Sequence, residues 1–283
     1  RLPPSPAPPP TRTPVPPPTA ARSPAPLPTR PFVPLPTTTP PPQRLPTAPA
    51  GADEAPVVVL DPGHGGDEIG AVYSGGGLVL REKDVNLAIA QRLAGLLRTA
   101  GYRVVLTREG DTGVNRQAKD LTGDGRVDVA DDLQARIDLA NASGAQLLFS
   151  IHNNSSASPR ETGSEVYYCP ERTYADRNLA VAKLLQSAFI QRLGEAGYRP
   201  RDRGVKADTG FRYYDGRPYC ASLLGPAQLP RRPRGTQMPA ALGESLFMLN
   251  SEGALLARGD ILDAIAQAYF DAATGYFSRY PAR

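Results

Sequence analysis

The chain has 283 residues, of which 32 are proline and two are cysteine, and its formal net charge at pH 7 is +4. Residues 1–50 hold 21 of the prolines, five arginines and no acidic residue, so removing those five charges from +4 leaves residues 51–283 at −1. This distribution excludes nucleic acid as the expected partner, because that function needs clustered Lys and Arg on a folded face, and no apolar run reaches the roughly 18 residues of a membrane span.

Residues 1–55 are predicted to form a disordered, Pro-rich stalk, because stretches such as PSPAPPP offer few backbone donors and no large apolar side chains. A polyproline-like chain advances about 3.1 Å per residue, so this stalk spans on the order of 150 Å. We expect a spacer between an anchor and the domain that follows; a solvated linker or an SH3-type ligand is the alternative. The chain begins at Arg1 without a visible signal peptide, which indicates a processed product or a fragment.

Residues 56–283 are predicted to form a single α/β domain. The apolar run at 57–60 predicts a strand buried on both faces. The next helix is expected at 84–99 with Asp84 as its N-cap. Further strands are expected at 102–107, 145–151 and 163–168, and further helices at 132–142, 175–194 and 260–277. This alternation predicts a mostly parallel, twisted sheet with helices on both faces.

The two histidines of the chain both follow predicted strands. His64 lies in VVVLDPGHGG and His152 in LLFSIHNN. Because ligands bind beyond the carboxyl ends of the strands in open α/β sheets, we expect both imidazoles at the same rim. Glu82 lies at the mouth of the loop that feeds the first helix and can point over this rim. Two His and one Glu with a fourth position open are the ligands of a catalytic zinc site; buried structural histidines and a solvated loop carboxylate are the alternative.

Glu244 is the candidate proton shuttle of such a site. It lies in MPAALGESLFMLN, where it is the only carboxylate in an otherwise apolar stretch. Burial raises the pKa of a carboxyl group, which suits a general base that does not itself bind the metal. The alternative is a strand residue whose side chain is turned to solvent.

Four motifs in order resemble one family of enzymes. VVVLDPGHGG, REKDVNLAIA, SIHNN and ALGESLFMLN are similar to the motifs of zinc-dependent N-acetylmuramoyl-L-alanine amidases of the amidase-3 class. DRGVKADTGF at 202–211 resembles the segment before that family's last strand, and the whole resemblance covers about residues 56–278. It implies hydrolysis of the amide between N-acetylmuramic acid and the L-alanine of the stem peptide. Peptidoglycan is then the partner, and the location is extracytoplasmic.

The resemblance also assigns roles to residues. It implies that His64, Glu82 and His152 are the zinc ligands and that Glu244 is the catalytic carboxylate. Asn154 and Asn250 correspond to family asparagines and are candidate substrate contacts. The chain departs from the family pattern at Leu246 and Leu249, where Gly and Ser are usual.

The first of two insertions, at about 110–131, resembles a calcium loop. Gly125 is at position 6 of an EF-hand-like spacing, where it permits a sharp turn. The expected oxygen ligands are Asp120, Thr122, Asp124, Asp128 and Asp131, together with the backbone carbonyl of Arg126. The spacing is similar to that of dockerin calcium loops, which also end in Asp. Thr122 and the short Asp131 predict weak affinity, and an acidic, Gly-rich surface loop is the alternative.

The second insertion, at about 212–237, is rich in aromatic and basic residues. Its candidate ligand-facing side chains are Tyr213, Tyr214, Tyr219, Arg231, Arg232 and Arg234. They are consistent with a wall for a glycan and an anionic peptide, with a lid, or with a surface loop pinned by Cys220. Cys169 and Cys220 either form a disulfide or remain two thiols.

Other functions remain as alternatives to the amidase. Two His and one carboxylate also fit another metal-dependent peptidoglycan peptidase, such as a carboxypeptidase, or a non-haem iron oxygenase. The oxygenase fits poorly, because that chemistry is commonly housed in all-β barrels. A non-catalytic wall-binding scaffold would not need Glu244 beside an open metal site. The Gly-rich segment after His64 lacks the GK[ST] ending of a phosphate-binding loop. We expect a monomer.

Overall fold

The computed structural model describes residues 55–212, 218–219, 221, 223–227 and 233–282. The predicted stalk at 1–55 therefore lies outside the described residues except for its last residue. The same holds for four of the candidate ligand-facing residues of the second insertion, Tyr213, Tyr214, Arg231 and Arg232, and for Cys220. Among the described residues, no helix combines the length and apolarity needed to cross a bilayer.

Six strands form one mixed sheet in the order β4-β1-β5-β10-β6-β7. Their bounds are β1 Val57–Pro62, β4 Arg103–Leu106, β5 Leu147–Asn154, β6 Ser164–Tyr168, β7 Asp202–Ala207 and β10 Ala240–Phe247. β4, β1, β5 and β10 run parallel, whereas β6 is antiparallel to β10 and parallel to β7. The predicted mostly parallel sheet is confirmed.

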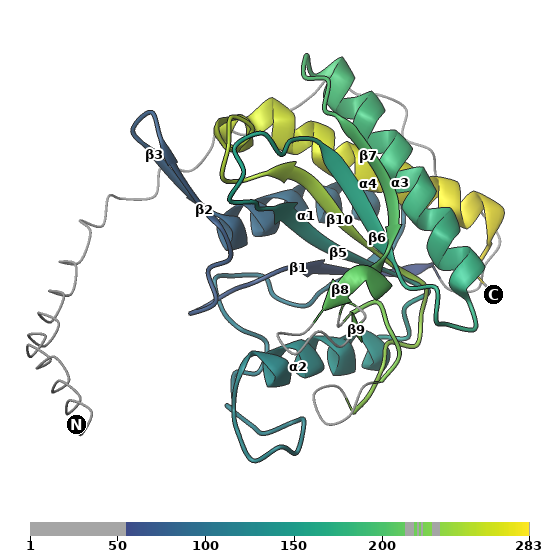
Figure 1. Ribbon diagram of the computed structural model, residues 1–283. Helices are drawn as coiled ribbons and strands as arrows, with labels where there is room; N and C mark the ends of the chain where they lie inside the picture. The colour runs from purple at the N-terminus through teal and green to yellow at the C-terminus, as the bar shows by residue number, and fades with distance from the viewer. Residues whose placement is uncertain (1–54, 213–217, 220, 222, 228–232, 283) are drawn as a thin grey trace, which may run out of the picture. The chain divides into compact units, whose positions relative to one another are not determined.

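Helices cover both faces of this sheet (Figure 1). Helices α1 (Glu82–Thr99), α3 (Ala175–Glu195) and α4 (Gly259–Arg279) share a core with the odd-numbered residues of β5, such as Phe149. Helix α2 (Val129–Ala142) packs on the opposite face, where Ile137 meets Leu148. The central strands are continuous apolar runs because both of their faces are buried.

The start of α1 differs from the prediction. The helix begins at Glu82, with Arg81 in extended conformation at the N-cap position, so Asp84 is not the N-cap. Asp84 lies in the first turn, where a negative charge interacts favourably with the helix dipole. Glu82 is therefore the first residue of a helix rather than a loop residue, and the helix fixes the direction of its side chain.

A hairpin that the sequence did not predict precedes α1. Its strands are β2 (Val72–Gly75) and β3 (Leu78–Arg81), and they pair antiparallel. Gly76 and Gly77 form the turn with positive φ angles of 57° and 79°, which glycine adopts without strain. Strands β8 (Phe211–Arg212) and β9 (Pro218–Tyr219) pair antiparallel in a separate two-stranded sheet. The remaining elements are the 3₁₀ helices η1 (Asp208–Gly210) and η2 (Gly253–Ala257).

Candidate active site

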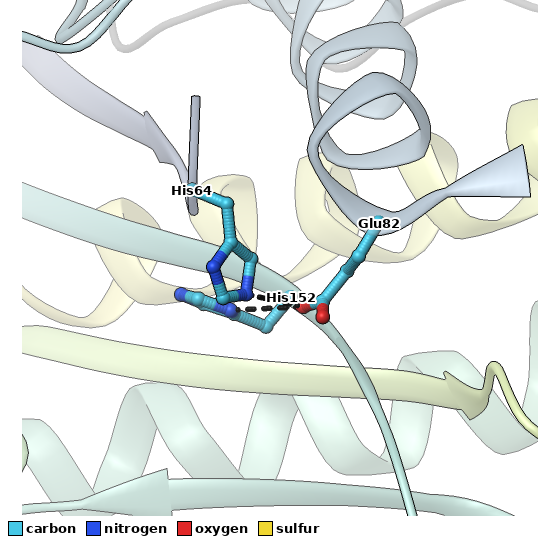
Figure 2. A group of neighbouring side chains, drawn as sticks. All are labelled: His64, Glu82 and His152. Carbon is cyan, nitrogen blue, oxygen red and sulfur yellow. Dashed lines mark hydrogen bonds and ion pairs between the residues drawn. The ribbon is translucent and has the colours of Figure 1, made fainter. Parts of the chain in front are cut away.

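His64, Glu82 and His152 converge at the carboxyl edge of the parallel strands (Figure 2). His64 follows β1, Glu82 opens α1 and His152 lies near the end of β5. His64 Nε2 is 3.0 Å and His152 Nδ1 is 3.1 Å from the same atom, Glu82 Oε1. One ligand atom from each residue lies within 4.8 Å of the others, and within the described part of the chain no other group of three or more His, Cys, Asp or Glu meets this condition.

The carboxylate of Glu82 is held in place from two sides. Its Oε2 accepts a hydrogen bond from the Ala71 amide at 3.0 Å, and Oε1 accepts one from the Asn153 amide at 3.2 Å. Burial alone would raise the pKa of Glu82, but hydrogen bonds and charge interactions with His152 and His64 lower it well below its usual value. An ionised carboxylate between two imidazoles is a donor set that fits zinc.

The orientation of His64 is set by its second ring nitrogen and its backbone. Nδ1 contacts the Glu68 carboxylate, so Nε2 faces Glu82. Burial opposes protonation of the ring, but hydrogen bonds with Glu68 and Glu82 outweigh it and raise the pKa of His64 to about 9. The residue has a φ of 64°, and its carbonyl accepts a hydrogen bond from Arg136 Nη2 at 2.8 Å. A carboxylate on the far nitrogen is the usual way in which proteins orient a metal-ligating histidine.

Two glycines make room for the three ligands. A Cβ atom at Gly63 would lie 2.0 Å from His152 Cε1. A Cβ atom at Gly70 would lie 2.6 Å from His64 Cδ2 and 2.7 Å from Glu82 Oε2. Neither glycine was identified as a functional residue from the sequence, because the need for close approach arises only when distant segments fold together.

Glu244 lies beside this group on β10. Its Cα pairs with His152 of β5 on one side and with Glu165 of β6 on the other, so the three side chains share one face of the sheet. Glu244 is half-buried, and its Oε2 is buried with no hydrogen-bond partner among the described residues, so this end of the side chain lies inside the protein. Burial, and then the negative charges of Glu82 and Glu165, raise the pKa of Glu244 well above its usual value.

Glu165 is a buried acid that sequence reasoning missed. Burial would raise its pKa, but the hydrogen bonds that it accepts keep the pKa below the usual value. Its donors are Lys206 and Arg203, each at 2.5 Å, the Tyr167 hydroxyl at 2.7 Å and Asn154 Nδ2 at 2.8 Å. The available signal was a charged residue in the strand motif GSEVYY. The result is an ionised carboxylate fixed next to Glu244.

The two asparagines expected to contact substrate lie in different surroundings. Asn154 is two residues past His152 at the strand edge, and its amide donates to Glu165. The Asn250 side chain donates to the Glu161 carbonyl and accepts from the Glu252 amide at 2.8 Å, so both ends of it are engaged in the loop after β10. A substrate contact by Asn154 or Asn250 stays a prediction.

The predicted calcium loop directs its carboxylates at its own backbone. Asp120 accepts hydrogen bonds from the Gly123, Asp124 and Gly125 amides. Asp131 is fully buried, and its carboxylate accepts hydrogen bonds from the Leu121, Thr122 and Asp128 amides. The bond from the Asp128 amide, together with the bond that the Asp128 side chain accepts, forms a capping box at the start of α2. Calcium binding through Asp120, Thr122, Asp124, Arg126, Asp128 and Asp131 therefore has no support from this arrangement and stays a prediction.

The described parts of the second insertion pack against α2 rather than standing free. Leu223 and Leu224 are buried in the core that contains Ile137. Arg234 forms an ion pair with Asp138, with distances of 2.6 and 2.7 Å. Cys169 is buried, and its predicted partner Cys220 lies outside the described residues, so the disulfide stays a prediction.

Comparisons with known proteins identify the family to which the chain is similar. A family model described as N-acetylmuramoyl-L-alanine amidase matches residues 58–274. N-acetylmuramoyl-L-alanine amidase LytC of Bacillus subtilis is 31% identical over 222 residues, which are 78% of this chain and 35% of that protein. The germination-specific amidase of the same organism is 39% identical over 141 residues, or 48% of this chain and 54% of that protein. The chain thus spans about a third to a half of these relatives' length.

Solved structures show the same similarity in three dimensions. The amidase AmiC2 of Nostoc punctiforme superposes with a TM-score of 0.57 at 29% identity. The aligned region covers 79% of this chain and 98% of that one.

Proposed function

The chain belongs to the N-acetylmuramoyl-L-alanine amidase family, and we propose that it hydrolyses the amide bond between N-acetylmuramic acid and the L-alanine of the stem peptide in peptidoglycan, with zinc as its cofactor. The observation that carries the proposal is the convergence of His64, Glu82 and His152 with Glu244 in the adjacent strand position. Two imidazoles and one ionised carboxylate leave a coordination position for water and substrate, which distinguishes catalytic from structural zinc sites.

His64 Nε2, Glu82 Oε1 and His152 Nδ1 are the atoms that face one another and would hold the ion. When bound, zinc supplies Lewis-acid chemistry: it polarises the carbonyl under attack and makes water acidic enough to lose a proton near neutral pH. The protein's part is to hold the three side chains in the correct directions. Glu68 does this for His64, and the Ala71 amide does it for Glu82.

Glu244 moves the proton in this proposal. Its carboxylate accepts a proton from the attacking water as the water oxygen bonds to the lactyl carbonyl carbon. The same group then delivers that proton to the nitrogen of L-alanine as the carbon–nitrogen bond breaks, which yields a muramic-acid carboxylate and a free peptide amine. A buried carboxyl whose pKa is raised is a stronger base when ionised and a ready acid when protonated.

Fixed charges near Glu244 support this role. Glu165 is held ionised by Arg203 and Lys206 and therefore opposes the loss of the Glu244 proton through its negative charge. The chain acts, we propose, outside the cytoplasm, where peptidoglycan lies, and as a monomer. The stalk at 1–55 would then act as the spacer expected from its composition.

The test is a comparison of Glu244→Gln with His152→Ala on purified cell walls. Glu244→Gln should bind zinc as the wild type does and lose about 10²–10⁴-fold in turnover, because only the proton transfer is removed. His152→Ala should lose both zinc and activity. Glu195→Gln, an exposed carboxylate at the end of α3 paired with Arg192, is the matched control and should change neither.

Product analysis identifies the bond that is cut. A free N-terminal L-alanine on the released peptide is the expected product, whereas released D-alanine would identify a carboxypeptidase. Turnover at the wild-type rate by a folded Glu244→Gln protein would overturn the role of Glu244.

A further inference from the structure

Three buried cations surround the loop that carries His64. Arg108 and Arg136 are each 2% exposed and Lys83 is 5% exposed. Lys83 forms an ion pair with Asp111, and Arg136 forms ion pairs with two aspartates, Asp61 and Asp132. Arg108 differs from both, because its hydrogen bonds within the described part of the chain all go to backbone carbonyls.

The guanidinium of Arg108 connects two segments that are distant in sequence. On one side, Nε donates to the Pro62 carbonyl at 2.9 Å and Nη2 to the Gly63 carbonyl at 3.1 Å. These two residues immediately precede His64. On the other side, Nη2 donates to the Lys83 carbonyl at 2.7 Å, one residue past Glu82. The fourth bond, from Nη1 to the Gly110 carbonyl at 3.0 Å, holds the arginine's own loop.

This position is an unfavourable one for a cation. Burial and the nearby charge of Arg136 lower the pKa of Arg108 to about 10. The loop also closes tightly around the side chain: a Cβ at Gly65 would lie 2.9 Å from both Arg108 Cδ and Nε. A planar group with five donors in fixed directions can satisfy four carbonyls from three segments at once, which a single ammonium group cannot.

We propose that Arg108 is a positioning residue of the metal centre, which sets the separation of His64 and Glu82 by tying together the backbone segments that carry them. The inference rests on the proposed zinc site. Arg108 touches neither ligand side chain and acts only through the carbonyls on either side. Groups that orient metal ligands from outside the coordination sphere typically contribute 10–100-fold to metal affinity.

The experiment compares zinc affinity in Arg108→Lys, Arg92→Lys and the wild-type chain, by competition with a chromogenic chelator. Arg92 lies on α1 and forms an ion pair with Asp263, so its replacement makes the same chemical change on the helix that carries Glu82 without touching the loop. We expect Arg108→Lys to bind zinc about 10–100-fold more weakly, and Arg92→Lys to bind it as tightly as the wild type. Melting of the metal-free proteins separates this effect from a general loss of stability.

A second variant isolates the guanidinium itself. In Arg108→Ala, added guanidinium ion should restore part of the lost zinc affinity, and it should leave the wild type unchanged. Wild-type zinc affinity in either Arg108 variant would overturn the inference. Variants that stay unfolded at saturating zinc would also overturn it, because Arg108 would then serve the fold rather than the site. A wild-type chain that binds no zinc would instead overturn the proposed metal site, and the inference with it.

Discussion

Replacing Gly63 by alanine tests the packing of the metal centre most directly. The ring of His152 lies over the Cα of Gly63, where the methyl group of an alanine would lie 2.0 Å from Cε1, 2.2 Å from Nε2 and 2.6 Å from Nδ1. The φ of Gly63 is outside the positive range that disfavours other residues, so alanine tolerates the backbone and only the new methyl group matters.

The size of the effect follows from which group is free to move. The Gly63 backbone is held because its amide donates to the Ile151 carbonyl at 3.0 Å and its own carbonyl accepts from Arg108 at 3.1 Å. The imidazole must therefore retreat by about 1.4 Å, from 2.0 Å to the 3.4 Å at which ordinary contact begins. Metal ligands must be held to within about 0.5 Å, and a displacement of about 1 Å costs on the order of 10²-fold in rate.

We expect Gly63→Ala to lose at least 10-fold in zinc affinity and about 10²-fold in turnover on purified cell walls, while the metal-free protein melts as a folded domain. Gly95→Ala is the matched control, because a Cβ at Gly95 in α1 would meet no atom within 4 Å. That change should leave activity unaltered and raise stability by about 0.5–1 kcal/mol, since glycine is unfavourable inside a helix. A Gly63→Ala protein with wild-type zinc affinity and turnover would refute the close packing of His152 on this loop.

Two further predictions concern stability. If the loop 120–131 binds calcium, millimolar calcium should raise the melting temperature and Asp120→Asn should abolish the rise; an unchanged melting temperature in the wild type would count against calcium. Asp61→Asn should lower the free energy of unfolding at pH 7 by about 3–5 kcal/mol, because it breaks a buried ion pair with Arg136. Burial alone would raise the pKa of Asp61, but the charge of Arg136 and the Thr107 hydrogen bond bring it below 3.8. This stability is present above pH 3.8 and is lost as the pH falls through the lower pKa that Asp61 has in the folded protein. The difference in unfolding free energy between variant and wild type, measured by denaturant unfolding, should therefore shrink below pH 3.8. A difference that does not change with pH would contradict this role of the Asp61–Arg136 pair.

The order of the predicted strands and helices along the sequence was enough to predict much of the candidate site. Both histidines come after apolar runs that had to be strands, and parallel strands joined by helices place their carboxyl ends at one edge of the sheet. For that reason, His64 and His152 could be brought together without knowing the strand order. The same argument placed Glu82 near them, although α1 starts two residues earlier than expected and holds Glu82 in its first turn.

The tertiary structure alone decided which distant groups surround those residues. Glu165 becomes the neighbour of Glu244 only because β6 pairs antiparallel with β10. Arg108 binds the carbonyls beside both ligands only because β4 lies against β1. Local patterns in a sequence set the type and direction of each element, since they reflect backbone conformation and the burial of one face. The register between strands and the contacts of long side chains depend on how the elements pack together, and the pattern of any single segment carries little of that information.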